Sequence, residues 1–181
     1  ALYTADRLTD KWENGKPLNG LDEKNNNNYP FILSDGVTLY FAADGEESLG
    51  GYDIFITRYN SENNQYLKPE NIGMPFNSPA NDYMLVIDEF NNLGWFASDR
   101  NQPEGQVCIY TFIPNEKNTT LDEELFDTEH LRRRAQLVSI KDTWKNNQEM
   151  QRAKQRIASA KYTETESKKV QKDFELIIDD L

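Results

Sequence analysis

The first residues that could do chemistry are the carboxylates of an acidic loop. Asp44, Glu46 and Glu47 stand close together, and Asp53 follows shortly after them. Paired carboxylates can act as acid and base in glycoside hydrolysis, and clustered oxygens in a loop suit calcium. The spacing does not match an EF-hand, however, and turn formation accounts for Asp44 and Asp53. The sequence therefore predicts no cofactor and no metal, with Asp44 and Glu46 as the alternative calcium ligands.

Other signatures of catalysis are missing from the sequence. The single histidine, His130, excludes a histidine ligand cluster and the HExxH motif. The chain has no Gly-x-Ser-x-Gly nucleophile elbow. It also has no glycine-rich phosphate loop of the GxxxxGK[ST] or GxGxxG type. These observations predict that the protein is not an enzyme.

Aromatic side chains are the second group that could bind a ligand. On strands they alternate, so half must face a sheet interface, and we expect Phe41 and Phe96 to lie in the core. Tyrosine and tryptophan in or near loops are better candidates for contact with a partner. The predicted binding residues on the loop surface are Trp12, Tyr29, Tyr52 and Tyr83.

Charge and composition exclude several classes of partner. The net charge of −11 argues against nucleic acid, because phosphate binding requires a basic surface. The same charge opposes docking on anionic lipid. No apolar run approaches the roughly 20 residues of a membrane span, so no transmembrane segment is predicted.

An internal repeat indicates which elements position these residues. Two motifs occur twice: Gly-x-Pro-apolar-Asn at residues 15–19 and 73–77, and x-aromatic-Phe-Ala-x-Asp at residues 39–44 and 94–99. The offset is 58 residues for the first motif and 55 for the second, and 55 persists from Ile54 to Ile109. The polar stretch 24–28 takes up the difference of three, as a loop between strands does.

Each copy of the repeat has the pattern of short antiparallel strands broken by turns. Asp35-Gly36 is a hairpin signal between strands expected at 31–33 and 37–41, and Gly50-Gly51 precedes another at 52–57. The second copy predicts strands at 84–87, 93–97 and 107–112. Three or four short strands in a period of about 55 residues suit a propeller blade.

The stretch Ser34 to Gly45, with Gly50-Gly51-Tyr52-Asp53 after it, resembles the PD40 repeat of TolB-like β-propellers. Residues 97–100 (Ala-Ser-Asp-Arg) are similar to a turn of the same repeat. The resemblance implies a structural role for the signature residues Asp35, Gly36, Asp44, Gly50, Gly51, Asp53, Asp99 and Arg100. The second copy departs from the pattern, with residues 89–92 replacing the Asp-Gly turn and residues 105–108 replacing Gly-Gly-x-Asp.

The resemblance also implies a location and a role. It is closest in pattern to exported Bacteroidetes proteins, whose propellers stand beside tetratricopeptide or OmpA-like peptidoglycan-binding domains. We therefore expect a non-enzymatic protein-binding or scaffold module of the cell envelope, in the periplasm or associated with the outer membrane. Its partners would be other envelope proteins or the remainder of its own propeller, since two blades cannot close a ring. The alternatives are association with peptidoglycan or another glycan, and a glycan-degrading propeller domain.

The C-terminal third has a helical composition. After a connector at 114–127, residues 128–181 lack Gly and Pro, and Asp127-Thr128 can cap a helix that carries Leu131, Ala135 and Val138. A second helix is expected from residue 146, and residues 163–178 form a third helix or end in a strand. The predicted fold is mainly β, with two antiparallel propeller-type blades in residues 1–113 followed by a helical segment.

Overall fold

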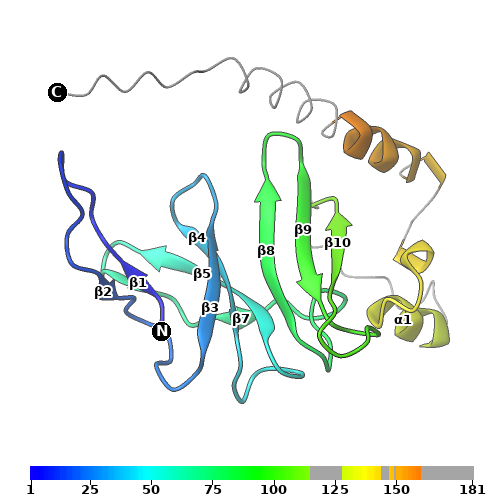
Figure 1. Cartoon of the computed structure of the whole chain (residues 1–181), viewed down its shortest axis with the longest axis horizontal. Helices are drawn as coiled ribbons and strands as arrows, with labels where there is room; N and C mark the ends of the chain where they lie inside the picture. The colour runs from blue at the N-terminus through cyan, green and yellow to red at the C-terminus, as the bar shows by residue number, and fades with distance from the viewer. Residues whose placement is uncertain (115–127, 144–146, 149, 160–181) are drawn as a thin grey trace, which may run out of the picture. The chain divides into compact units, whose positions relative to one another are not determined.

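The computed structural model describes residues 1–114, 128–143, 147–148 and 150–159. The fold is mainly β: three antiparallel sheets are accompanied by a few short helices (Figure 1). The chain divides into two compact units, Ala1–Asp142 and Thr143–Leu181. All three sheets belong to the first unit, and so does the helix α1 (Thr128–Ala135), which the sequence grouped with the helical region.

The largest sheet has five strands in a meander. Its strands are β3 (Asn27–Ile32), β4 (Thr38–Ala43), β5 (Asp53–Asn60), β6 (Gln65–Tyr66) and β7 (Glu70–Asn71). β3, β4 and β5 pair in sequence order, and β6 and β7 both pair with β5. Asp35 and Gly36 form the β3–β4 turn, as the sequence predicts; Gly36 has a φ of 67°, and Asp35 Oδ1 accepts from the Val37 and Thr38 amides at 2.8 Å each.

The second sheet contains β8 (Asp82–Asp88), β9 (Leu93–Ser98) and β10 (Cys108–Phe112) in the order β10-β9-β8. These strands agree with those expected from the second copy of the repeat. A two-stranded sheet of β1 (Tyr3–Thr4) and β2 (Lys16–Pro17), which the sequence did not indicate, lies at the N-terminus.

The two larger sheets repeat the same local structure at the 55-residue offset. The register shifts in both β3 and β8, and the shifted residues Tyr29 and Met84 have left-handed φ angles of 53° and 57°. Such a bulge adds a residue to one strand and bends it. The sequence copies are therefore also copies in three dimensions, including irregular features that a residue-type pattern does not predict.

One aspartate closes each copy, Asp44 in the first and Asp99 in the second. Asp44 accepts hydrogen bonds from the backbone amide and the side-chain amide of Asn26, both at 2.8 Å. Asp99 binds the same two groups of Asn81, both at 2.7 Å. The bonds to Asn26 hold the pKa of Asp44 below its ordinary value. Each aspartate thereby fixes the end of one strand to the segment that begins the neighbouring strand.

Two apolar layers cover the two faces of the β3–β7 sheet. Between this sheet and the β8–β10 sheet lies a cluster built on Ile54, Leu85 and Phe96, and Figure 1 shows β3 and β8 side by side there. On the opposite face, the N-terminal segment covers Leu39, Phe41, Ala43 and Phe55 with Leu2, Leu18 and Leu21. Leu18 and Phe76, the apolar residues of the two Gly-x-Pro-apolar-Asn motifs, thus pack against corresponding faces.

The helices confirm part of the expectation for the C-terminal third. α1 begins at Thr128 but ends at Ala135, before Val138. Leu137 adopts a left-handed φ of 49°, and the Val138 amide donates to Arg133 O at 3.1 Å, a pattern that terminates helices. A 3-10 turn follows at Ile140–Thr143, and residues 150–159 are helical as predicted. The expected third element at 163–178 lies outside the described residues.

A buried ion pair ties β8 to the end of β9, and its arginine also binds the segment before this sheet. Arg100 Nη2 lies 2.5 Å from Asp82 Oδ1, with side-chain exposures of 4% and 0%. Arg100 also donates through Nε to Ser98 Oγ at 2.9 Å and through Nη1 to Pro75 O at 2.7 Å, and it donates to Phe76 O. A charge this deep requires such a complete set of partners.

Breaking this pair should destabilise the protein severely. Because Arg100→Met leaves Asp82 buried without its partner, we expect the free energy of unfolding to fall by about 3–5 kcal/mol. The control is Lys68→Met at the exposed pair with Glu47, where we expect little or no loss because solvent screens the pair. Urea unfolding followed by tryptophan fluorescence measures both, and equal losses in the two variants would contradict the assignment.

The β3–β4 turn makes a prediction about pH. Hydrogen bonds lower the pKa of Asp35 from 3.8 to about 2, with the Thr38 hydroxyl as the largest cause. A depressed pKa means that the carboxylate stabilises the fold above pH 3.8 and that this stabilisation is lost as pH falls toward about 2. Thr38→Val should raise the pKa of Asp35 toward 3.8.

An NMR titration of the carboxyl carbons measures this change. Asp44 is the internal control, because its pKa is lowered by Asn26 and not by Thr38. A pKa of Asp35 that stays the same in Thr38→Val would show that the hydroxyl has no such role.

Candidate functional site

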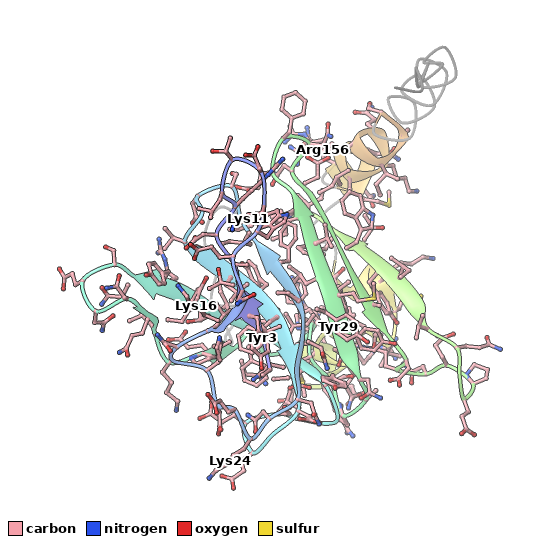
Figure 2. The ribbon with its side chains drawn as sticks, turned by 60° about the vertical axis from the view of Figure 1, so that its left-hand side comes forward. Tyr3, Lys11, Lys16, Lys24, Tyr29 and Arg156 are labelled. Atoms are coloured by element: carbon pink, nitrogen blue, oxygen red, sulfur yellow. The ribbon has the colours of Figure 1, made fainter. Side chains whose placement is uncertain are left out.

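Three of the four predicted surface aromatics meet in one place. Tyr29 lies in the β3 bulge, Tyr52 immediately before β5 and Tyr83 in β8. The rings of Tyr29 and Tyr83 stack with centroids 5.2 Å apart, and Tyr52 meets Tyr29 edge to face at 6.2 Å. Tyr29 is 44% exposed, and the other two are half-buried. We call these three residues the tyrosine cluster; Figure 2 shows Tyr29 at the β3–β8 boundary.

The backbone of both larger sheets positions the tyrosine cluster. The Tyr52 amide donates to Asn81 Oδ1 at 3.0 Å, and the Asp82 amide donates to Tyr52 O at 2.6 Å. The Tyr52 hydroxyl accepts from Asn28 Nδ2 at 2.8 Å. The segment before β5 is therefore tied both to β3 and to the start of β8. The cluster is a joint product of the two repeat copies, and Tyr52 is held in it through both its backbone and its hydroxyl.

The surroundings of Tyr83 favour the neutral form of its phenol. Partial burial raises the pKa of Tyr83 above its ordinary value of 10.0, and the carboxylate of Asp99 and the ring of Tyr29 add to the effect. A neutral phenol both donates and accepts hydrogen bonds. The cluster thus offers apolar ring surface together with hydroxyl groups, which is chemistry for recognition.

Trp12, the fourth predicted surface aromatic, lies in the N-terminal segment, apart from the tyrosine cluster. It is 65% exposed and pairs with Arg7 in an isolated bridge, with the guanidinium 5.8 Å from the ring centroid. Figure 2 shows Lys11, its neighbour in sequence, well separated from Tyr29. Trp12 is exposed as expected, but the structure does not bring it to the tyrosine cluster.

Gly50, Gly51 and Asp53 form the loop beside the tyrosine cluster. A Cβ on Gly50 would lie 2.3 Å from the carbonyl carbon of Pro79, and one on Gly51 would lie 2.1 Å from Asn81 Oδ1. Only glycine permits this close approach of the two sheets' loops. Asp53 is fully buried, and its Oδ2 accepts from the Leu49 amide at 2.8 Å and from the Asn71 side chain at 2.7 Å.

The remaining predicted residues do not assemble a metal centre. Both carboxylate oxygens of Asp44 are bound to Asn26, and Glu46 is exposed on the adjoining loop. Among the residues that the structure describes, no three His, Cys, Asp or Glu side chains lie close enough to hold a metal ion.

No helix in the described part of the chain is long and apolar enough to cross a membrane.

Sequence reasoning missed a cavity of about 480 Å³ on the face of the β3–β7 sheet that the N-terminal segment covers. Its apolar wall includes Phe41, Ala43 and Phe55, and its mouth carries charged side chains of both signs. The full lining is Gly20, Asp22, Lys24, Asn25, Asn27, Phe41, Ala43, Gly45, Glu46, Glu47, Phe55, Lys68 and Pro69. The sequence feature that could have indicated this cavity is the difference between Gly45 and Arg100, which occupy the same position of the two copies.

Comparison with known proteins gave no match to a family model, to a curated protein or to a solved structure.

Asp53 yields a test of the loop that supports the tyrosine cluster. Burial is the largest cause of its raised pKa. Just above pH 3.8 the folded state therefore binds more protons at this site than the unfolded state, so its contribution to stability falls as pH rises. Asp53→Asn removes that dependence. In urea unfolding at a series of pH values, the free energy of unfolding of the variant should increase relative to that of the parent protein as pH rises above 3.8. A difference between the two proteins that does not change with pH would refute the assignment.

Proposed function

We propose that this chain is a non-enzymatic protein-binding module built from two consecutive propeller-type blades of a larger β-propeller. The observation that carries the binding role is the tyrosine cluster. Tyr29, Tyr52 and Tyr83 come from both larger sheets and present rings and hydroxyls on a rigid frame. Tyrosine is enriched at protein interfaces and at their hot spots, because it combines apolar area with a polar group at little entropic cost.

The assignment to propeller blades is supported by how differently the two copies of one residue are buried. Ile54 is 1% exposed because the β8–β10 sheet packs on it, whereas Ile109, its equivalent, is 60% exposed. Asn77 hydrogen-bonds to both backbone groups of Ile54, each at 2.8 Å. A further sheet of the same type would bury Ile109 in the same way. The Gly-x-Pro-apolar-Asn motif of that further sheet would supply an asparagine for the backbone of Ile109, as Asn77 does for Ile54.

The carboxylates also support a role in binding and not in catalysis. Asp44, Asp53 and Asp99 each hold an asparagine side chain, at 2.7 or 2.8 Å. Both oxygens of Asp44 and of Asp99 are bound in this way, as is Oδ2 of Asp53, so these carboxylates serve to fix loops. A glycan-binding or glycan-degrading domain is the alternative reading of the same acidic loops and rings.

The cell envelope is the proposed location, in the periplasm or associated with the outer membrane. This rests on the resemblance of residues 50–55 (Gly-Gly-Tyr-Asp-Ile-Phe) to repeats of exported Bacteroidetes proteins. Fractionation of cells that produce the complete protein tests it: the protein should appear in the periplasmic or outer-membrane fraction, and a cytosolic location would contradict the proposal.

Removing two rings of the tyrosine cluster should weaken partner binding by at least about thirtyfold, as expected for hot-spot residues. The variant combines Tyr29→Asn, chosen because asparagine tolerates a positive φ, with Tyr83→Ala. The partner is first identified by cross-linking in envelope extract and mass spectrometry, and its affinity is then measured with purified proteins.

Phe90→Ala is the matched control. Phe90 is 96% exposed in the turn after β8, so this variant loses an exposed aromatic ring outside the tyrosine cluster. Unchanged affinity in the double variant would contradict the protein-binding proposal. Binding to a glycan array that disappears in the same variant would instead support the glycan alternative.

A further inference from the structure

The cavity on the β3–β7 sheet has a filled counterpart in the second repeat copy. At the 55-residue offset, five residues of its lining correspond to Arg100 and the residues around it: Asn27 to Asp82, Phe41 to Phe96, Ala43 to Ser98, Gly45 to Arg100 and Phe55 to Tyr110. The Arg100 side chain thus occupies, in the second copy, the position that is a cavity in the first. The protein itself therefore shows which chemical group this kind of site accepts.

Arg100 displays the interactions of such a group in full. Its guanidinium carbon lies 5.6 Å from the centroids of both Phe96 and Tyr110, within cation–π range. The nitrogens bind Asp82 and Ser98, with backbone carbonyls completing the set. The site combines two aromatic rings, a side-chain oxygen at the sheet edge and a shell that excludes water.

The first copy keeps most of this arrangement without the arginine. Phe41 and Phe55 are stacked with centroids 5.9 Å apart and an interplanar angle of 24°. The Asn27 side chain is 4% exposed and donates through Nδ2 to Asp22 O at 2.8 Å, which leaves Oδ1 as the acceptor of this amide. Gly45 has no side chain to fill the space. The rings and a side-chain acceptor are present, and the arginine is not.

The mouth of the cavity suits a cation that arrives from outside. Three carboxylates, those of Asp22, Glu46 and Glu47, line it together with Lys24 and Lys68. Lys68 is paired with Glu47 at 2.7 Å, and Figure 2 shows Lys24 at the outer end of its loop. The chain as a whole carries a net charge of −11, which attracts cations to its surface.

We propose that this cavity binds a guanidinium group, the side chain of an arginine presented by a protein partner; the partner part of this inference rests on the proposed protein-binding function. A guanidinium fits better than an ammonium because it is planar, stacks on aromatic rings and is less strongly hydrated. Phe41 and Phe55 would lie beside it as Phe96 and Tyr110 lie beside Arg100, and Asn27 Oδ1 would accept one of its N–H groups. The partner's arginine takes the place that Arg100 takes in the second copy.

The first test uses the complete chain and a small probe, so it does not depend on knowing the partner. Nα-acetyl-arginine amide is titrated into the labelled protein and followed by NMR, with the citrulline analogue as the uncharged isostere and the lysine analogue as the ammonium. We expect saturable shifts of the Ala43 and Gly45 amides with the arginine probe, weaker shifts with lysine and none with citrulline. Equal responses to arginine and citrulline, or no response to arginine, would overturn the proposal.

Two substitutions convert the first copy toward the second. Gly45→Arg supplies the cavity with an arginine of its own and should abolish binding of the probe. Ser61→Arg, which adds the same charge on an exposed turn, should leave the binding unchanged. Asn27→Asp replaces the neutral acceptor by the carboxylate found in the second copy and should tighten binding about tenfold, since charge-assisted hydrogen bonds are stronger. Full retention of binding in Gly45→Arg would overturn the assignment.

A third measurement identifies the source of the guanidinium and separates this inference from the proposed function. The affinity of the identified partner is compared between the parent protein and Gly45→Arg. A loss in Gly45→Arg supports a partner arginine; unchanged partner affinity combined with probe binding would overturn it in favour of a free guanidinium compound. The variant with two tyrosines replaced should still bind the probe. If that variant keeps its affinity for the partner while Gly45→Arg loses it, the proposed role of the tyrosine cluster fails and the inference about the cavity stands.

Discussion

Arg100 carries a full positive charge to a position that is 4% exposed, and the segments around it are arranged to accept that charge. Asp82 opens β8, Ser98 closes β9, and the carbonyls come from the Gly-x-Pro-apolar-Asn motif at 73–77. One side chain thus fixes the beginning of a strand, the end of its neighbour and the segment that precedes both. If any of these moved, a buried charge or a buried donor would lose its partner, at a cost of several kcal/mol. The packing of Phe76 and Phe96 depends on the same anchor, because Arg100 also lies over the Phe96 ring.

The first copy reaches the same fold without this anchor. Its strand ends are fixed by the Asp44–Asn26 bonds, and its covered face is closed by Leu2, Leu18 and Leu21 from the N-terminal segment. Apolar burial there replaces much of what the ion pair does in the second copy. That substitution leaves a cavity, because an N-terminal segment that packs apolar side chains does not fill the space of a guanidinium. The filled site in the second copy and the cavity in the first follow from several differences between the copies, of which Gly45 against Arg100 is the largest in side-chain volume.

The tyrosine cluster shows how a recognition surface arises from the junction between two copies. Tyr29 and Tyr83 occupy neighbouring positions in equivalent bulges, one residue apart in repeat register, so their rings meet only because β3 and β8 lie side by side. The loop with Gly50 and Gly51 then brings Tyr52 to them. The surface and the cavity lie on different parts of the first unit, and each uses residues from more than one strand.

The sequence by itself determined the features whose causes are local. The Asp35-Gly36 turn, β4, β5, the strands of the second copy and the start of α1 follow from residues only a few positions apart, whose backbone preferences and alternation act without help from the rest of the chain. β3 is the exception, because it begins at Asn27, inside the stretch 24–28 that the sequence predicts as a loop. Only the tertiary structure decided the contacts between distant residues. Arg100 and Asp82 are 18 positions apart, and their meeting depends on the register of β8 against β9. The left-handed Tyr29, the separation of Trp12 from the tyrosine cluster and the cavity likewise depend on which segments pack together, and a pattern of residue types along the chain does not contain that information.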